Sequence, residues 1–191
     1  MAGFWEGGDL VAVRNIDLID VFGADNVVTV GAGVLERLNF PRDAAEVLVR
    51  VGLPKEVEPL PFTPQEPNVR ADSPRGLVYV FGNDFGIPYV PGAVHGASYC
   101  VEGGTGEVWR IRHDPARPAT FISSALESFI ECLLRFEILW QRIPEEFTTD
   151  DAVAGTWGTF LEEELRKVDT RTVAKDNYFS FIVRDIKNGT F

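Results

Sequence analysis

The chain has 191 residues, of which 45% are hydrophobic and 12% aromatic, so general disorder is excluded and a core of domain size is expected. Twenty-nine acidic residues against 18 basic ones give a net charge of −11, which would repel a nucleic acid or an anionic membrane. We therefore expect one domain over residues 1–191 with neither of these as a direct partner. A basic protein would be attracted, although the same charge also serves solubility.

The cysteine content and the hydropathy of the sequence bear on the cellular location of the protein. Cys100 and Cys132 are the only cysteines, too few for a disulfide framework or a zinc cluster, and we expect both to be thiols in or near the core. No segment approaches the roughly 18 apolar residues of a membrane span. Residues 1–13 lack the basic and apolar regions of a signal peptide, so a cytoplasmic location is predicted.

Helix and strand signals alternate in the first half of the chain. Pro41 suits the first turn of a helix that Gly52 can close, after a β-branched run over residues 27–30. Residues 60–74 are rich in proline and predict an extended connection that adds at most an edge strand. The continuous apolar run over residues 76–82 is typical of a strand covered on both faces.

A hairpin is predicted next. Residues 87–90 and 97–101 are strand candidates, and the glycine-rich turn at residues 102–106 makes residues 97–112 a hairpin. In its second strand, Trp109 and Ile111 alternate with mostly polar residues. We expect this apolar face to pack on the helix that follows, with Trp109, Phe129, Ile130 and Leu133 as the joint.

That helix is long and amphipathic. Ser124 and Glu127 have the spacing of a capping box, in which each side chain bonds an orphan amide at the helix start. Glu127, Glu131 and Arg135 lie four residues apart on a second face, and Pro144 should end the helix. The apolar face comprises Leu126, Phe129, Ile130, Leu133, Phe136 and Trp140.

Two more helices are predicted at the C-terminal end. Thr149 should cap a helix through Lys167, and a last helix should run near residues 172–187. Helices at both ends of a run of strands predict an α+β fold, with a mostly antiparallel or mixed central sheet flanked by helices. The residues expected to face inward from the first of these helices are Val153, Trp157, Phe160, Leu161 and Val168.

No pattern in the sequence indicates catalysis, a cofactor or a metal. Gly31-Ala32-Gly33 follows a β-branched run, but Glu36 takes the place of the third glycine of a dinucleotide fingerprint, which favours a simple turn. His95 and His113 lack metal-ligand spacing. Asp114 could orient His113, yet no nucleophile elbow is present, and a solvated histidine is favoured.

Acidic residues concentrate in the C-terminal third. Residues 143–170 contain eight acids and two basic residues, a net charge of −6. Part of this excess is explained by capping of a helix N-terminus and by a solvated helix face; the remainder suits a docking patch for a basic partner. The candidate contacts are Asp150, Asp151, Glu162, Glu163 and Glu164, with Glu102 and Glu107 on the hairpin as a competing patch.

The order of short motifs resembles the SUKH immunity-protein superfamily, and most closely its fourth family. The resemblance covers most of the chain from about residue 40 onward. The matching segments are Phe40-Pro41, residues 51–54, the strand 76–81, residues 106–109, residues 121–129, Trp157, residues 165–169, Tyr178-Phe179 and Asn188-Gly189.

This resemblance implies a non-enzymatic immunity protein that binds a cognate toxin domain and blocks its active site. Toxins of such systems are often nucleases or nucleic-acid deaminases. The chain itself lacks the zinc-binding Pro-Cys-x-x-Cys and His-x-Glu motifs of a deaminase. Two alternatives stay open: a regulatory scaffold that binds a host protein, and a hydrolase that uses paired carboxylates.

Overall fold

The computed structural model describes residues 15–84, 96–143, 147 and 149–190. Within these residues the predicted α+β fold is confirmed: six α-helices accompany a five-stranded antiparallel sheet, ordered β3-β4-β5-β6-β7, and a two-stranded sheet, β1-β2. The helices are α1 (Asn15–Phe22), α2 (Ala32–Leu38), α3 (Arg42–Arg50), α4 (Leu126–Trp140), α5 (Asp151–Val168) and α6 (Tyr178–Lys187), with a 3-10 helix at Ala24–Asn26. The strands are β1 (Val27–Val28), β2 (Leu53–Pro54), β3 (Thr63–Ser73), β4 (Gly76–Asp84), β5 (Ala97–Glu102), β6 (Val108–Arg112) and β7 (Thr120–Ser123).

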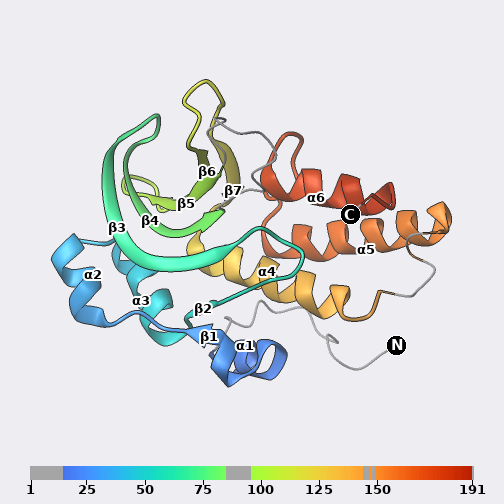
Figure 1. The fold of residues 1–191 in the computed structure, drawn as a ribbon, viewed down its shortest axis with the longest axis horizontal. Helices are drawn as coiled ribbons and strands as arrows, with labels where there is room; N and C mark the ends of the chain where they lie inside the picture. The colour runs from blue at the N-terminus through green and yellow to red at the C-terminus, as the bar shows by residue number, and fades with distance from the viewer. Residues whose placement is uncertain (1–14, 85–95, 144–146, 148, 191) are drawn as a thin grey trace.

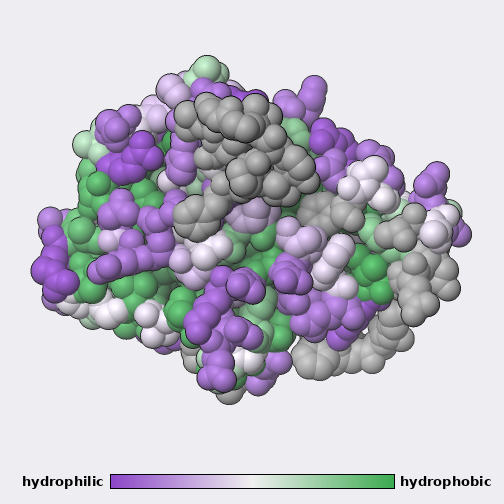
Figure 2. All heavy atoms as spheres, in the orientation of Figure 1, coloured by the Kyte–Doolittle hydropathy of each residue, from purple (hydrophilic) through white to green (hydrophobic). Residues whose placement is uncertain are grey.

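The large sheet is strongly curved, and its two faces belong to different apolar clusters (Figure 1). In β4, Tyr79 and Phe81 join the main core with α4, whereas Val78 and Val80 belong to a smaller cluster on the other face. The prediction that this strand is covered on both faces is therefore confirmed. The proline-rich β3 is the edge strand, as expected, and Figure 2 shows hydrophobic residues between hydrophilic ones over β3 and β4.

Helix α4 supplies the centre of the main core. Phe129 is fully buried, and its ring lies 5.4 Å from that of Phe62, 5.9 Å from those of Phe81 and Tyr99, and 6.5 Å from that of Phe179 (ring centroids). One side chain thus connects the sheet to α6, which Figure 1 shows beside α5 at one end of the molecule. Ile130 and Leu133 are buried as predicted.

The predicted role of Trp109 is wrong. Trp109 packs against the smaller cluster, while its neighbour Val108 is fully buried in the main core on the α4 side. Strand periodicity separates two faces but does not say which face meets the helix, and here both faces are covered. The Trp109 ring instead lies against Phe121, at 5.4 Å, and under the guanidinium of Arg75, at 3.8 Å from the ring centroid.

The predicted capping box at the start of α4 is also wrong. Ala125 occupies the N-cap position without a side-chain hydrogen bond, so Glu127 is the second helical residue and not the third. The backbone amide of Ser124 donates to the carboxylate of Asp169, at the end of α5, over 2.6 Å. A residue distant in sequence therefore provides the acceptor for the chain at this helix start.

Other helix boundaries differ slightly from the predictions. Asp150, not Thr149, caps α5, because its carboxylate accepts from the amides of Ala152 and Val153 at 2.8 and 3.3 Å. Helix α6 begins at Tyr178, six residues later than expected. The predicted strand at residues 87–90, together with Pro144 and His95, lies outside the described residues.

Burial tests the remaining core predictions. Cys100 and Cys132 are free, fully buried thiols, as predicted, and burial raises the pKa of Cys100 to about 12. Leu161 is buried on α5, and Trp157 and Val168 pack against the core. The expectation for Phe160 is wrong, because 46% of its side chain is exposed on the outer side of α5.

Candidate functional site

Glu164 is not a surface acid. It is 8% exposed, and its carboxylate accepts from Arg135 Nη1 at 2.7 Å and pairs with Lys167. Arg135, 8% exposed on α4, also donates to the carboxylate of Glu131. These residues form a buried ion network between α4 and α5, so the second face of α4, on which their spacing places Glu131 and Arg135, is covered by α5.

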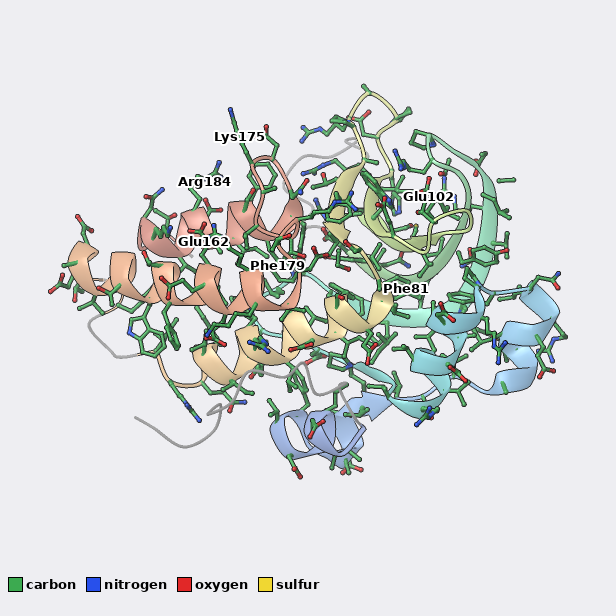
Figure 3. All side chains as sticks on the ribbon, turned by 180° about the vertical axis from the view of Figure 1, so that it is seen from behind. Phe81, Glu102, Glu162, Lys175, Phe179 and Arg184 are labelled. Atoms are coloured by element: carbon green, nitrogen blue, oxygen red, sulfur yellow. The ribbon has the colours of Figure 1, made fainter. Side chains whose placement is uncertain are left out.

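Glu162 connects α5 to α6. Lys187 Nζ and Arg166 Nη2 donate to its two carboxylate oxygens, each over 2.5 Å. The hydrogen bond from Lys187, with the nearby positive charges, lowers the pKa of Glu162. Figure 3 shows Glu162 between the two helices. Its charge is therefore largely matched within the protein.

The other acids of α5 point to solvent. Asp150 is exposed but holds the first-turn amides of the helix. Asp151 and Glu163 are exposed and have no ion-pair partner among residues 15–84, 96–143, 147 and 149–190. Of the five acids proposed on this helix, these two present free charge to a partner. Glu145 and Glu146, which add to the acidic excess in the sequence, lie outside the described ranges.

A shallow hollow of about 480 Å³ lies on the same outer side of α5. Its residues recur at intervals of three and four, so they share one helix face. Small side chains form most of it, and Phe160 and Glu163 stand at its C-terminal end. We name this set the α5 outer stripe: Ala152, Gly155, Thr156, Thr159, Phe160 and Glu163.

The competing acids on the hairpin are neutralised by arginines. Glu102 accepts from Arg75 Nη2 at 3.1 Å and from Thr105 Oγ1 at 2.7 Å, and Glu107 accepts from Arg171 Nη1 at 2.7 Å. Desolvation opposes ionisation of Glu102, but these hydrogen bonds outweigh it and lower its pKa. The two acids are brought together around Arg75, and Figure 3 shows Glu102 well separated from Glu162.

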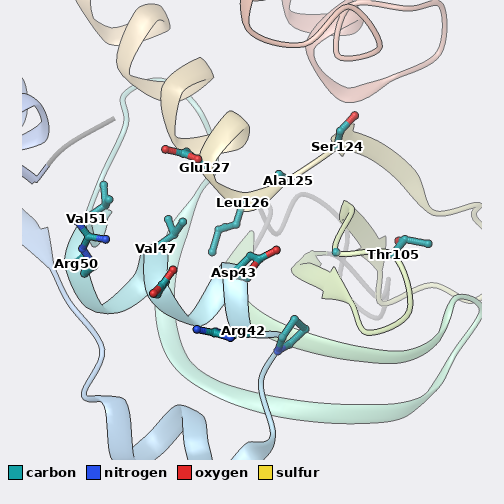
Figure 4. A pocket seen from close by; sticks show the side chains of 14 residues that line it. Arg42, Asp43, Val47, Arg50, Val51, Thr105, Ser124, Ala125, Leu126 and Glu127 are labelled. Atoms are coloured by element: carbon teal, nitrogen blue, oxygen red, sulfur yellow. The ribbon is translucent and has the colours of Figure 1, made fainter. Parts of the chain in front are cut away.

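A groove of about 810 Å³ lies between α3, the hairpin turn and the start of α4 (Figure 4). Leu126 and Val51 contribute its apolar floor. Its charged lining mixes signs, so it favours neither a basic nor an acidic ligand. Sequence reasoning missed it because three segments distant in the chain form it. Its charged side chains are Arg42, Asp43, Glu46, Arg50 and Glu127.

The patterns weighed for catalysis have structural roles here. Gly31 is the N-cap of α2, and β1 before it pairs antiparallel with β2, so Gly31-Ala32-Gly33 does not lie in the parallel βαβ unit of a dinucleotide site. His113 is exposed as predicted, and its Nε2 lies 3.1 Å from Oγ of the buried Ser98. Among the described residues no group of three or more histidine, cysteine or acidic side chains could hold a metal ion. Likewise, no helix in the described ranges is both long and apolar enough to cross a bilayer.

Comparison with known proteins identifies the family. The model of the SUKH-4 immunity protein family matches residues 14–179, which include every described element except most of α6. No curated protein and no solved structure matches the chain significantly. The match confirms the resemblance read from the short motifs and supports an immunity role. The chain therefore belongs to the SUKH-4 immunity protein family.

Proposed function

We propose that this protein is a non-enzymatic inhibitor that binds a cognate basic toxin domain and blocks its active site. The observation that carries the proposal is the family match over residues 14–179. The net charge of −11 supports the same conclusion from an independent property. An enzyme that acts on nucleic acid carries a basic cleft for phosphates, and an acidic protein competes for that cleft. The proposed toxin is therefore a nuclease or a nucleic-acid deaminase.

Exposed acids on α5 are the proposed steering charges. The pairing of Glu162 and Glu164 with cations of the protein reduces what these two offer to a partner. Asp151 and Glu163, with the exposed Asp150, keep their charge toward solvent. Glu102 and Glu107 are the weaker candidates, because Arg75 and Arg171 already neutralise them.

Co-expression tests the inhibitory role. The toxin domain encoded by the neighbouring gene is expressed in cells with and without this protein, and a catalytically inactive form of that domain is used for binding in vitro. We expect protection in cells and copurification of the pair at low salt. No protection, or no association at low salt, contradicts the immunity proposal and favours a scaffold that binds a host protein.

Association kinetics test the steering. Replacing Asp151 and Glu163 by lysine should slow association, with a smaller change in dissociation, and should reduce the dependence of the on-rate on salt. Reversal of Glu162 to Glu164 together is a poorer test, because Glu164 is buried against Arg135. The matched control reverses two exposed acids away from α5, Glu36 and Glu56, which changes the net charge equally.

A further inference from the structure

The α5 outer stripe combines open space with an exposed aromatic ring. An added Cβ at Gly155 would meet no atom within 4 Å, so the middle of the stripe is open. Phe160, at 46%, is the most exposed of the large hydrophobic side chains described. Another exposed phenyl group, Phe181 on α6, has the guanidinium of Arg184 over its ring at 5.2 Å, whereas the stripe places small residues beside Phe160.

The threonines of the stripe offer acceptors and methyl carbons. Thr156 Oγ1 donates to the carbonyl of Ala152, and Thr159 Oγ1 donates to the carbonyl of Gly155, each over 2.8 Å. Since both hydroxyl protons are used within the helix, the oxygens retain only acceptor capacity. Donors on a partner, such as lysine or arginine, suit this surface, whereas acceptors do not.

We propose that the α5 outer stripe is the docking surface for the toxin domain, an inference that rests on the proposed function. An apolar side chain of the toxin occupies the hollow over Gly155 and contacts Phe160. Lysine or arginine side chains of the toxin surround it and pair with Glu163 and Asp151. Aromatic anchors with a charged rim are typical of the residues that dominate binding energy at interfaces.

The groove beside α3 does not compete for this role. It is larger, at about 810 Å³, but Arg42 and Arg50 line it together with three acids. A basic toxin surface would meet like charge there. The stripe, in contrast, contains the unpaired carboxylate of Glu163 and, within its own six residues, no cation, and the exposed Asp151 lies next to it in the chain.

Gly155→Leu is the sharpest test, because its side chain starts in open space, with no atom within 4 Å of the added Cβ, and projects into the hollow. We expect the Kd for the inactive toxin domain to rise at least about 30-fold, with the Tm unchanged or higher. Gly33→Leu is the matched control: Gly33 is an exposed glycine within α2, and only the tip of Arg37 lies near its added Cβ, at 3.8 Å. This control should bind like the wild type.

Phe160→Ala is the second test and keeps the inference falsifiable if the leucine variant fails to fold. It should weaken binding by a similar factor, whereas Phe181→Ala should have little effect. If the wild type binds the toxin domain but both Gly155→Leu and Phe160→Ala bind within about threefold of it, the docking surface lies elsewhere and the proposed function stands. If the wild type itself does not bind, the proposed function and this inference both fail.

Discussion

Removing the arginine from the buried network between α4 and α5 should be among the most damaging single changes in this protein. Arg135, Glu131 and Glu164 are 7–8% exposed, and the guanidinium bonds both carboxylates. In Arg135→Met, the helices keep their packing volume, but two buried carboxylates lose their shared counter-charge. Breaking a buried pair in this way costs about 3–5 kcal/mol, a large part of the 5–15 kcal/mol that stabilises a typical domain.

Urea denaturation followed by circular dichroism measures this loss as a fall in the midpoint at constant slope. The triple variant Arg135→Met, Glu131→Leu and Glu164→Leu is the internal control, because it removes the uncompensated charge and should recover most of the lost stability. Lys167, which also pairs with Glu164, is 64% exposed and needs no replacement. A loss below about 1 kcal/mol in the single variant, or a triple variant as unstable as the single one, would refute the reasoning.

Three further predictions follow from packing and burial. Phe129→Ala should cost about 3–5 kcal/mol in urea denaturation, because four rings lose their common neighbour; a loss below about 1 kcal/mol would contradict its central position. Gly158→Ala should destabilise by about 1–3 kcal/mol, because its Cβ would lie 2.4–3.1 Å from side-chain and backbone atoms of α6, whereas Gly155→Ala on the same helix should stabilise by about 0.5–1 kcal/mol; equal Tm shifts would refute this. Burial raises the pKa of Tyr99, and that of Tyr178 to about 12. The contribution of these two phenols to the free energy of unfolding is therefore fully present below pH about 10 and is lost as the pH rises through about 12. Tyrosinate absorbance of the native protein should therefore show these two groups ionising together with unfolding, and a native titration of both near pH 10 would exclude the buried pair.

Local patterns predicted much of the fold because they depend on short-range physics. The apolar run of β4, the proline-rich edge strand and the apolar face of α4 are each set by residues adjacent in sequence. The errors at Ser124 and Trp109 arise because segments distant in sequence determine the contacts of these residues. The Ser124 amide donates to Asp169 and not to Glu127, the acceptor that the capping box predicted. No residue spacing near the start of α4 indicates this contact.

The same limit explains the buried network. Glu131 and Arg135 have the spacing of an exposed ion pair on a helix, and their sequence does not say that α5 covers them. Glu164 completes the network from 29 residues away. An i, i+4 pair reads identically whether its helix face meets water or another helix, so tertiary contact alone distinguishes the two cases.

For the candidate site, one signal was present in the sequence. Successive residues of an α-helix point about 100° apart, so three consecutive glutamates cannot all lie on one exposed face of a helix packed on two sides. In α5 the run divides as this geometry requires: Glu162 meets α6, Glu164 meets α4, and Glu163 points to solvent. The number of acids in the segment therefore overstates the charge offered to a partner. The exposed Phe160 adds an apolar contact that the number of acids does not indicate.

This division of the glutamates bears directly on how α5 can act as a binding surface. Glu162 and Glu164 fix the helix on two sides, through Lys187 of α6 and Arg135 of α4. The α5 outer stripe, which carries Glu163, consequently lies on a helix that these contacts already hold in place. A surface that is rigid before binding loses less conformational entropy when the complex forms, so less affinity is lost. In the proposed complex, Glu162 and Glu164 therefore contribute to binding without contacting the toxin domain, because they hold α5 in place.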